Sequence, residues 1–236
     1  MEHVLTTSRL KLTLITQAAR GSDELKWLHE LRSNKQSTLW SMSGPSKTLE
    51  ETENVIANYV PDPISDAPPT ADAVQKLYKI AYAVHEILSV PDTPSTAEET
   101  RFIGLVNLVS LAGKHLPLPP HLVIPAEDEK MTLVVELAYS FLPPGWGKGY
   151  ATEALTAVLD ACRSPKSREF WQPWEKVWMR AIVNGRNLAS QKVMRKMGPC
   201  GVSERGVFEW KGEPIFIGGE WMTEDDLHIF GGYLKE

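Results

Sequence analysis

The sequence predicts an α/β protein in which helices cover a mixed sheet. Alternating or continuous apolar runs indicate strands, and apolar residues at helical spacing indicate helices. The two kinds of element interleave: one strand, two helices, three strands, a helix, a strand, a helix and a closing hairpin. This order combines antiparallel neighbours with helical crossovers, which is typical of an α/β sheet.

Each element rests on a local pattern. Leu10, Leu12 and Leu14 alternate with polar residues in the first strand, and Ser46 and Asn187 are expected to cap two of the helices. The strands are expected at residues 8–16, 77–87, 101–111, 131–142 and 176–183. The helices are expected at residues 23–34, 46–60, 151–163 and 188–197. The hairpin is expected to turn near Lys211-Gly212.

We expect one domain over residues 1–236, although this length could also form two small domains. Of these 236 residues, 42% are hydrophobic, which is enough for one sizeable core. The Pro-rich stretches near 61–73 and 114–130 are expected to be loop insertions. A single domain is expected because no linker in the sequence is long enough to separate two domains. The protein is expected to be a monomer or a homodimer.

Charge and local patterns argue against several classes of partner. The net charge is -5 and the basic residues are scattered, so no nucleic-acid partner is expected. No apolar run reaches the roughly 18 to 20 residues that cross a bilayer, and the N-terminus does not resemble a signal peptide. We therefore expect a cytoplasmic protein with no membrane partner. We also expect no metal, because no two histidines have the spacing of metal ligands and neither cysteine has a neighbouring ligand. Cys162 and Cys200 are expected to be reduced thiols, and one long-range disulfide between them is the alternative.

The segment 143–155, PPGWGKGYATEAL, places a glycine-rich turn between a strand and a helix. The prolines end the strand, and the glycines allow the backbone to turn and to approach a bulky group closely. The N-terminus of the helix that follows carries unpaired N–H groups and a partial positive charge. This arrangement predicts an anion site, usually for phosphate.

Two common phosphate motifs do not fit this segment. A Walker loop needs Gly at position 142, which is Leu, and Ser or Thr at position 149, which is Gly. A dinucleotide fingerprint needs Gly or Ala at position 150 or 152, where Tyr and Thr stand.

The run GWGKGYATEA resembles the pyrophosphate-binding segment of the GNAT superfamily of acyl-CoA-dependent N-acetyltransferases. In that family the loop reads Gln/Arg-x-x-Gly-x-Gly/Ala, and Gly147 and Gly149 fill its glycine positions. Pro144 stands where the family has Gln or Arg, so this position supplies neither a side chain nor an N–H to the phosphates. Residues 147–154 most resemble the ribosomal-protein-alanine N-acetyltransferase-like branch. Further matches to that branch are Thr7, Arg9, Leu10, Leu12, Asn187 and Ser190.

The resemblance implies a GNAT fold, with a mixed and mostly antiparallel central sheet, a splayed central strand pair and helices on both faces. It implies acetyl-CoA as cosubstrate and direct attack by an amine acceptor, a small molecule or a protein N-terminus, in a ternary complex. The residues implied to bind the cofactor are Tyr139, Phe141, Leu142, Gly147, Lys148, Gly149, Tyr150, Ala151, Thr152 and Asn187.

Glu136 and Ser190 are the candidate catalytic residues. Glu136 stands in an apolar strand, where a carboxylate needs a hydrogen-bond partner or a wet cleft. It is either a base or anchor for the amine, or a structural carboxylate paired with a basic residue such as Arg180. The resemblance implies that Ser190 donates to the departing sulfur, and a helix-packing serine is the alternative.

Other positions keep two interpretations. Asn187 is expected to cap a helix and, by the resemblance, to bind the CoA arm. Tyr139 is either a candidate acid or a residue of the core. Lys148 lies either beside the phosphates or in solvent. For the whole chain, the alternatives are a non-catalytic acyl-CoA-binding protein and an interaction module with a degenerate loop.

Overall fold

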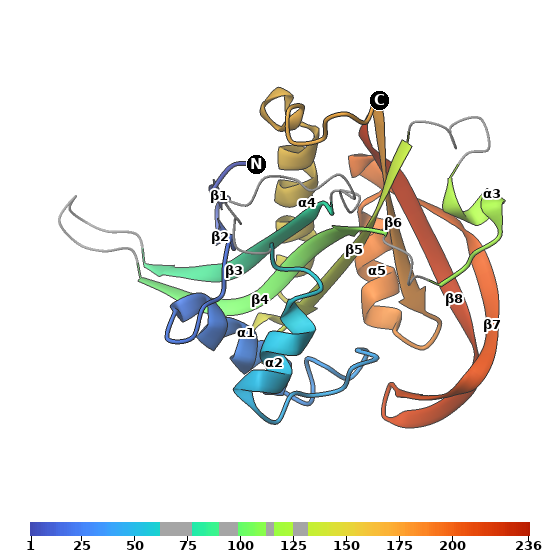
Figure 1. Cartoon of the computed structure of the whole chain (residues 1–236), viewed down its shortest axis with the longest axis horizontal. Coiled ribbons are helices and arrows are strands. Elements are labelled where there is room, and N and C mark those ends of the chain that lie inside the picture. The colour runs from blue at the N-terminus through green and yellow to red at the C-terminus, as the bar shows by residue number, and fades with distance from the viewer. Residues whose placement is uncertain (62–76, 90–98, 112–115, 125–131) are drawn as a thin grey trace, which may run out of the picture.

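The computed structural model describes residues 1–61, 77–89, 99–111, 116–124 and 132–236. Its described strands form one sheet in the order β1-β2-β3-β4-β5-β6-β8-β7 (Figure 1). Neighbouring strands are antiparallel throughout this sheet except β5 and β6, which run parallel. The strands are β1 (Val4–Thr6), β2 (Leu10–Leu14), β3 (Lys79–Ser89), β4 (Glu99–Ser110), β5 (Thr132–Phe141), β6 (Lys176–Asn184), β7 (Ser203–Ile217) and β8 (Glu220–Lys235). The mixed sheet confirms the predicted fold class.

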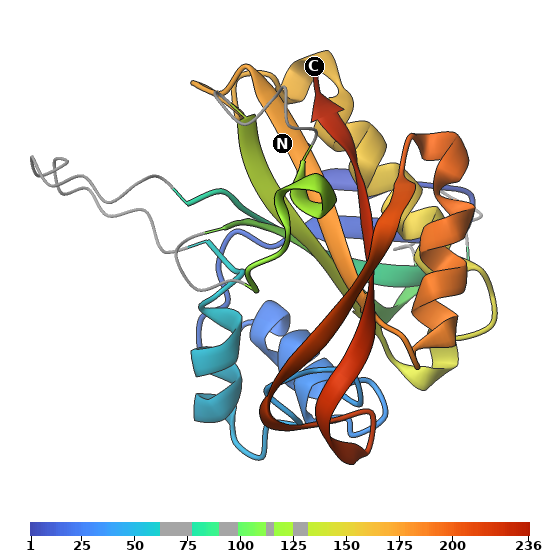
Figure 2. The same cartoon turned by 90° about the vertical axis from the view of Figure 1, so that its right-hand side faces the viewer.

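Helices cover both faces of the sheet. They are α1 (Asp23–Ser33), α2 (Leu49–Ile56), the short α3 (Pro120–Val123), α4 (Tyr150–Arg163) and α5 (Leu188–Lys196). One buried core joins α4 and α5 to the sheet through residues such as Leu155, Val135 and Met194. A second core, which includes Leu28 and Ile56, joins α1 and α2 to the opposite face of the sheet. Figure 2 shows α1 and α2 on the side of the sheet away from α4 and α5.

The parallel pair β5 and β6 separates partway along its length. The two strands are in register only from Thr132 opposite Lys176 to Glu136 opposite Arg180. Beyond this pair, β5 continues to Phe141 and β6 to Asn184 without pairing to each other. The predicted splay is therefore confirmed, and it opens toward the loops that lead into α4 and α5.

The second helix and its cap differ from the prediction. Helix α2 covers only Leu49–Ile56, and Thr48 caps it by accepting a 3.1 Å hydrogen bond from the Glu51 N–H. Ser46 was expected in that role, but its own N–H donates to the Arg32 carbonyl at 2.8 Å and holds it in the preceding loop.

The closing hairpin is longer than expected. It turns at Gly218 and Gly219, both with positive φ, rather than near Lys211-Gly212, which lies inside β7 at an irregularity of the register. A two-residue turn of this kind follows the twist of its strands and requires glycine-like backbone angles. The edge strand β1 was not predicted.

Two further predictions bear on the outline of the chain. The expected insertion near 61–73 lies almost wholly outside the described residues, and only residues 116–124 of the insertion near 114–130 are described. No helix in the described part of the chain combines the length and apolar character needed to cross a membrane.

Candidate functional site

The glycine-rich loop leaves β5 through a short turn. In this turn the Gly145 N–H donates to the Leu142 carbonyl at 2.9 Å, and the Trp146 indole donates to the Phe141 carbonyl at 2.7 Å. Gly147 and Gly149 then adopt φ values of +72° and +82°. Other residues pay about 1–2 kcal/mol for this conformation, so the predicted need for glycine is confirmed at both positions.

The loop ends at a helix N-terminus without a side-chain cap. The Glu153 N–H donates to the Gly149 carbonyl at 3.1 Å, so the amides of Tyr150, Ala151 and Thr152 lie ahead of this bond. Gly149 has no side chain to accept from them. Among the described helices of eight residues or more, the other N-termini are capped by Ser22, Thr48 and Asn187. The start of α4 thus keeps its donors for another acceptor.

A carboxylate on β3 holds the loop from one side. Oε1 of Glu86 accepts from the Tyr150 hydroxyl at 2.7 Å and from Lys148 Nζ at 3.2 Å, and Oε2 pairs with Arg101. The hydrogen bond from Tyr150, together with those from Arg101 and Lys148, outweighs burial and holds the pKa of Glu86 at about 2. Glu86 is therefore ionised at neutral pH and bound to three groups.

The turn between β1 and β2 holds the loop from the other side. Arg9 donates through Nε to Glu153 at 2.8 Å and through Nη1 to the Lys148 carbonyl at 3.0 Å. The Thr7 hydroxyl donates to the same Glu153 at 2.5 Å. Burial alone would raise the pKa of Glu153, but these bonds outweigh it and the pKa lies below its ordinary value.

Glu136 lies where β5 and β6 separate. Within the part of the chain that the structure describes, Glu136 accepts two hydrogen bonds, both from Arg180 and both at Oε2, from Nε at 3.0 Å and from Nη2 at 2.8 Å. Its Oε1 has no hydrogen bond among the described residues, and 40% of its side chain is exposed, against 1% for Arg180. The predicted alternative, a pairing of Glu136 with Arg180, is present. Oε1 can still accept a proton, or a hydrogen bond from an amine.

Ser190 and its neighbours stand at the start of α5. The Asn187 side chain accepts from the Ser190 N–H at 3.1 Å, which confirms Asn187 as the cap. The Tyr139 hydroxyl donates to the Ser190 carbonyl at 3.3 Å, and burial raises the pKa of Tyr139 to about 12. The Ser190 side chain is partly exposed and its hydroxyl has no partner among the described residues.

The structure separates the predicted cofactor residues into distinct groups. Those at the start of α4 lie together, and Tyr139 and Asn187 meet at Ser190 across the splay. The side chains of Phe141 and Leu142 are only 6% and 4% exposed and belong to the cores on opposite faces of the sheet. Tyr150 is buried as well, with its hydroxyl on Glu86.

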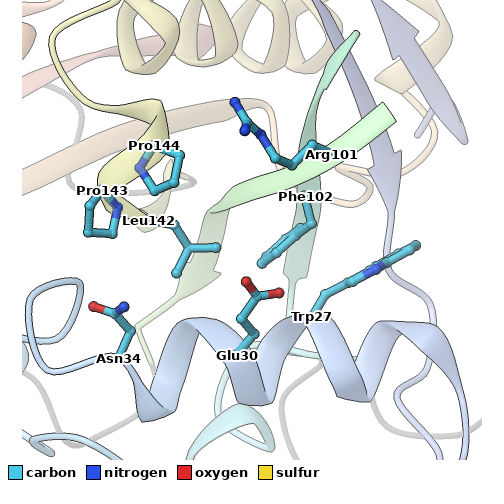
Figure 3. Close-up of a pocket in the computed structure, with 8 residues that line it drawn as sticks. All are labelled: Trp27, Glu30, Asn34, Arg101, Phe102, Leu142, Pro143 and Pro144. Atoms are coloured by element: carbon cyan, nitrogen blue, oxygen red, sulfur yellow. The ribbon is translucent and has the colours of Figure 1, made fainter. Parts of the chain in front are cut away.

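A surface pocket of about 440 Å³ adjoins the beginning of the loop (Figure 3). The rings of Trp27 and Phe102, stacked with centroids 6.0 Å apart, form part of its wall, and Glu30 extends into it from α1. The other residues that line it are Asn34, Arg101, Leu142, Pro143 and Pro144. The sequence did not predict this pocket.

The sequence interpretation also missed the residues that hold the loop. Glu86 carried the signal that singled out Glu136, a carboxylate within an apolar strand, but was not considered. Thr7 and Arg9 were noted only as part of a resemblance. Their connection to residue 153 spans more than a hundred positions and leaves no local pattern.

Burial disfavours nucleophilic chemistry at Cys162. Cys162 is 1% exposed, and burial raises the pKa of its thiol to about 12. A thiolate nucleophile is therefore disfavoured there. Within the described residues, no three His, Cys, Asp or Glu side chains come together as a metal site.

Solved structures with a similar fold support the fold described above. The structure matches an acetyltransferase of the GNAT family from Bacillus anthracis at 19% identity and a TM-score of 0.55, covering 99% of each chain. It also matches the spermidine N-acetyltransferase from Vibrio cholerae in complex with CoA and spermine, at 17% identity and a TM-score of 0.51, covering 94% and 95% of the two chains. No curated protein matches the sequence significantly. Residues 10–199 match the model of the acetyltransferase (GNAT) domain, and the chain therefore belongs to the GNAT acetyltransferase family.

Proposed function

We propose that the protein is an N-acetyltransferase that transfers the acetyl group of acetyl-CoA to a primary amine, on a small molecule or a protein N-terminus. The observation that carries this proposal is the uncapped start of α4 behind two glycines in the left-handed conformation. The family match supports it, because GNAT proteins use acetyl-CoA.

The diphosphate of CoA is placed on the backbone amides of residues 147–152. These amides lie before the Glu153–Gly149 bond of α4, where the helix dipole favours an anion. Pro144 contributes no N–H there, so the amides from Gly147 onward carry the interaction. Lys148 stands beside them, with a side chain that is 43% exposed.

The pantetheine arm is placed between the separated ends of β5 and β6. Beyond Glu136, β5 pairs with no described strand on this side, which leaves its backbone groups open to the amide groups of the arm. Tyr139 and Asn187 stand at this opening and hold the start of α5.

The reaction needs one proton removed and one thiolate accommodated. The amine nitrogen attacks the thioester carbonyl, the carbon–sulfur bond breaks, and the amine loses a proton that Glu136 accepts through Oε1. The Ser190 hydroxyl, free of other partners among the described residues, donates to the sulfur that leaves. Arg180 keeps Glu136 in place through Oε2 alone. Direct transfer is favoured because Cys162 is too buried to carry the acetyl group.

A non-catalytic acyl-CoA-binding protein is the second candidate. The ion pair between Glu136 and Arg180 favours it, because a carboxylate held by a guanidinium can be purely structural. The finer placement in the ribosomal-protein-alanine branch, the cytoplasmic location and the monomeric or homodimeric state remain predictions.

A CoA-release screen tests the function. Purified protein and acetyl-CoA are offered a polyamine, an amino acid, an aromatic amine and a peptide with a free N-terminus, while free thiol and the melting temperature are measured. Release with one class and a rise in melting temperature with CoA support the proposal. A rise with CoA but no release with any amine supports the non-catalytic alternative. No response to CoA contradicts both.

Two glycine variants localise the binding in the same assay. Gly147 has φ +72° and nothing within 4 Å of an added Cβ, so Gly147→Ala strains only the backbone of the loop. Gly44 has φ +62° with equally free space, outside the loop, and Gly44→Ala is the matched control. We expect Gly147→Ala to weaken CoA binding about 10-fold, in line with strain of about 1–2 kcal/mol, and Gly44→Ala to leave it unchanged.

A further inference from the structure

Glu153 presents an electrostatic difficulty for the diphosphate site described above. It stands in the first turn of α4, next to the amides that are placed under the diphosphate. A carboxylate there stabilises the helix through its dipole but repels an anionic ligand at the same end. Only 17% of the Glu153 side chain is exposed, so water screens this repulsion incompletely.

Arg9 contacts both Glu153 and the loop backbone. Nε and Nη2 donate to one oxygen of Glu153, and Nη1 donates to the Lys148 carbonyl at 3.0 Å. The guanidinium also lies 4.7 Å from the centre of the Tyr150 ring. One planar group thus pairs with the carboxylate, fixes a loop peptide and covers the first residue of α4.

The local balance of charge depends on this arginine. Around the loop, the carboxylates of Glu86 and Glu153 face Arg9, Lys148 and Arg101, which leaves a formal charge of +1. Without Arg9 the formal charge is zero and Glu153 has no cation within 4 Å among the described residues.

We propose that Arg9 is a positioning residue for the diphosphate of CoA, acting by neutralising Glu153 and by fixing the peptide of Lys148. Thr7 assists by donating to the second oxygen of Glu153. Lysine cannot replace Arg9 fully, because it supplies a charge without the planar fork that reaches a carboxylate and a carbonyl together. This inference rests on the proposed function, since it assumes that CoA binds at α4.

Titration calorimetry with CoA and with dephospho-CoA tests it. Dephospho-CoA keeps the diphosphate and lacks the 3′-phosphate. We expect Arg9→Ala to raise the Kd of both ligands about 10-fold at low salt and Arg9→Lys to raise it less, with a smaller effect at about 0.5 M salt because surface charges are screened.

A matched control and a second variant separate charge from structure. Arg20→Ala removes another Arg–Glu pair, in which Nε and Nη2 each donate to one oxygen of Glu53 at 2.8 Å, and should leave both Kd values unchanged. In Arg9→Ala/Glu153→Gln the uncompensated carboxylate is gone, so we expect tighter binding than in Arg9→Ala alone. A merely structural pair would make the double variant no better than the single one.

The remaining outcomes are decisive as well. If wild type binds CoA and Arg9→Ala binds it equally tightly, the inference is wrong and the proposed function stands. If the loss is confined to CoA and absent with dephospho-CoA, Arg9 acts on the 3′-phosphate and the inference is wrong. If wild type binds neither ligand, the proposed function fails and the inference fails with it.

Discussion

The two ends of the proposed site are held in different ways. At the start of α4, side chains from distant segments, Thr7, Arg9 and Glu86, bond to the loop or to the first turn of the helix. At the opening between β5 and β6, Glu136 has a single ion-pair partner, and the Ser190 hydroxyl has none among the described residues.

This difference follows from what each end has to do. Backbone amides bind an anion well only if they are already in position, so the loop needs contacts from outside itself. Groups that move protons must instead keep an atom free to accept or donate. Substitutions at the loop should therefore change affinity and stability, and substitutions at the opening should change the rate of acetyl transfer.

The largest expected effect is at Glu136. Glu136→Gln keeps an oxygen for Arg180 but cannot take a proton, so we expect kcat/KM to fall about 10²- to 10⁴-fold with the Kd of CoA unchanged.

Ser190→Ala should lower kcat about 10-fold, because the transition state loses a single hydrogen bond. Steady-state kinetics with the best amine from the screen measures both.

Ser33→Ala is the control for the serine change, since among the described residues its hydroxyl donates only to the Glu30 carbonyl on α1. Full activity in both Glu136→Gln and Ser190→Ala would show that the catalytic assignment is wrong. A rise in the Kd of CoA as large as the loss of rate would remove the distinction between the two ends.

A smaller effect is expected on the stability of the loop end. The pKa of Glu86 is about 2 in the folded protein against 4.5 for a free side chain, so its contribution is complete above pH 4.5 and is lost as the pH falls toward 2. At pH 7, Glu86→Gln should lower the free energy of unfolding by on the order of 1–2 kcal/mol, because its cationic partners are partly solvated.

Urea unfolding at several pH values measures this contribution. The difference between wild type and Glu86→Gln should shrink between pH 4.5 and pH 2. Glu30→Gln, at an exposed carboxylate of α1, is the control variant. A difference for Glu86→Gln that stays constant with pH would mean that Glu86 is not held ionised by its partners.

Much of the fold follows from local patterns in the sequence. The helix α4, the strand β5 and the cap Asn187 are close to their predicted positions because spacing, proline and capping chemistry act over a few residues. The hairpin turn was misplaced because Lys211-Gly212 looks like a turn by itself. The Gly218-Gly219 pair is a stronger signal for a two-residue turn and was overlooked.

In the candidate site, too, the features that depend on nearby residues were predicted and those that depend on distant residues were not. The glycine loop was predicted from its own residues, since the need for positive φ is local. Two long-range contacts hold the loop, from Arg9 to Glu153 and from Tyr150 to Glu86. These contacts depend on which strands become neighbours in the sheet, and the pattern within one segment does not predict that. The pocket lined by Trp27 and Phe102 was not predicted either, because its walls come from three segments that are distant in sequence: α1, β4 and the loop.

The proposed function depends on binding of the CoA diphosphate by the amides of residues 147–152. Backbone amide chemical shifts, recorded while CoA is added to ¹⁵N-labelled protein, test it most directly. The amides from Gly147 to Thr152 should show the largest shifts, and dephospho-CoA should produce the same pattern. Saturable binding of CoA that leaves these amides unmoved would contradict it.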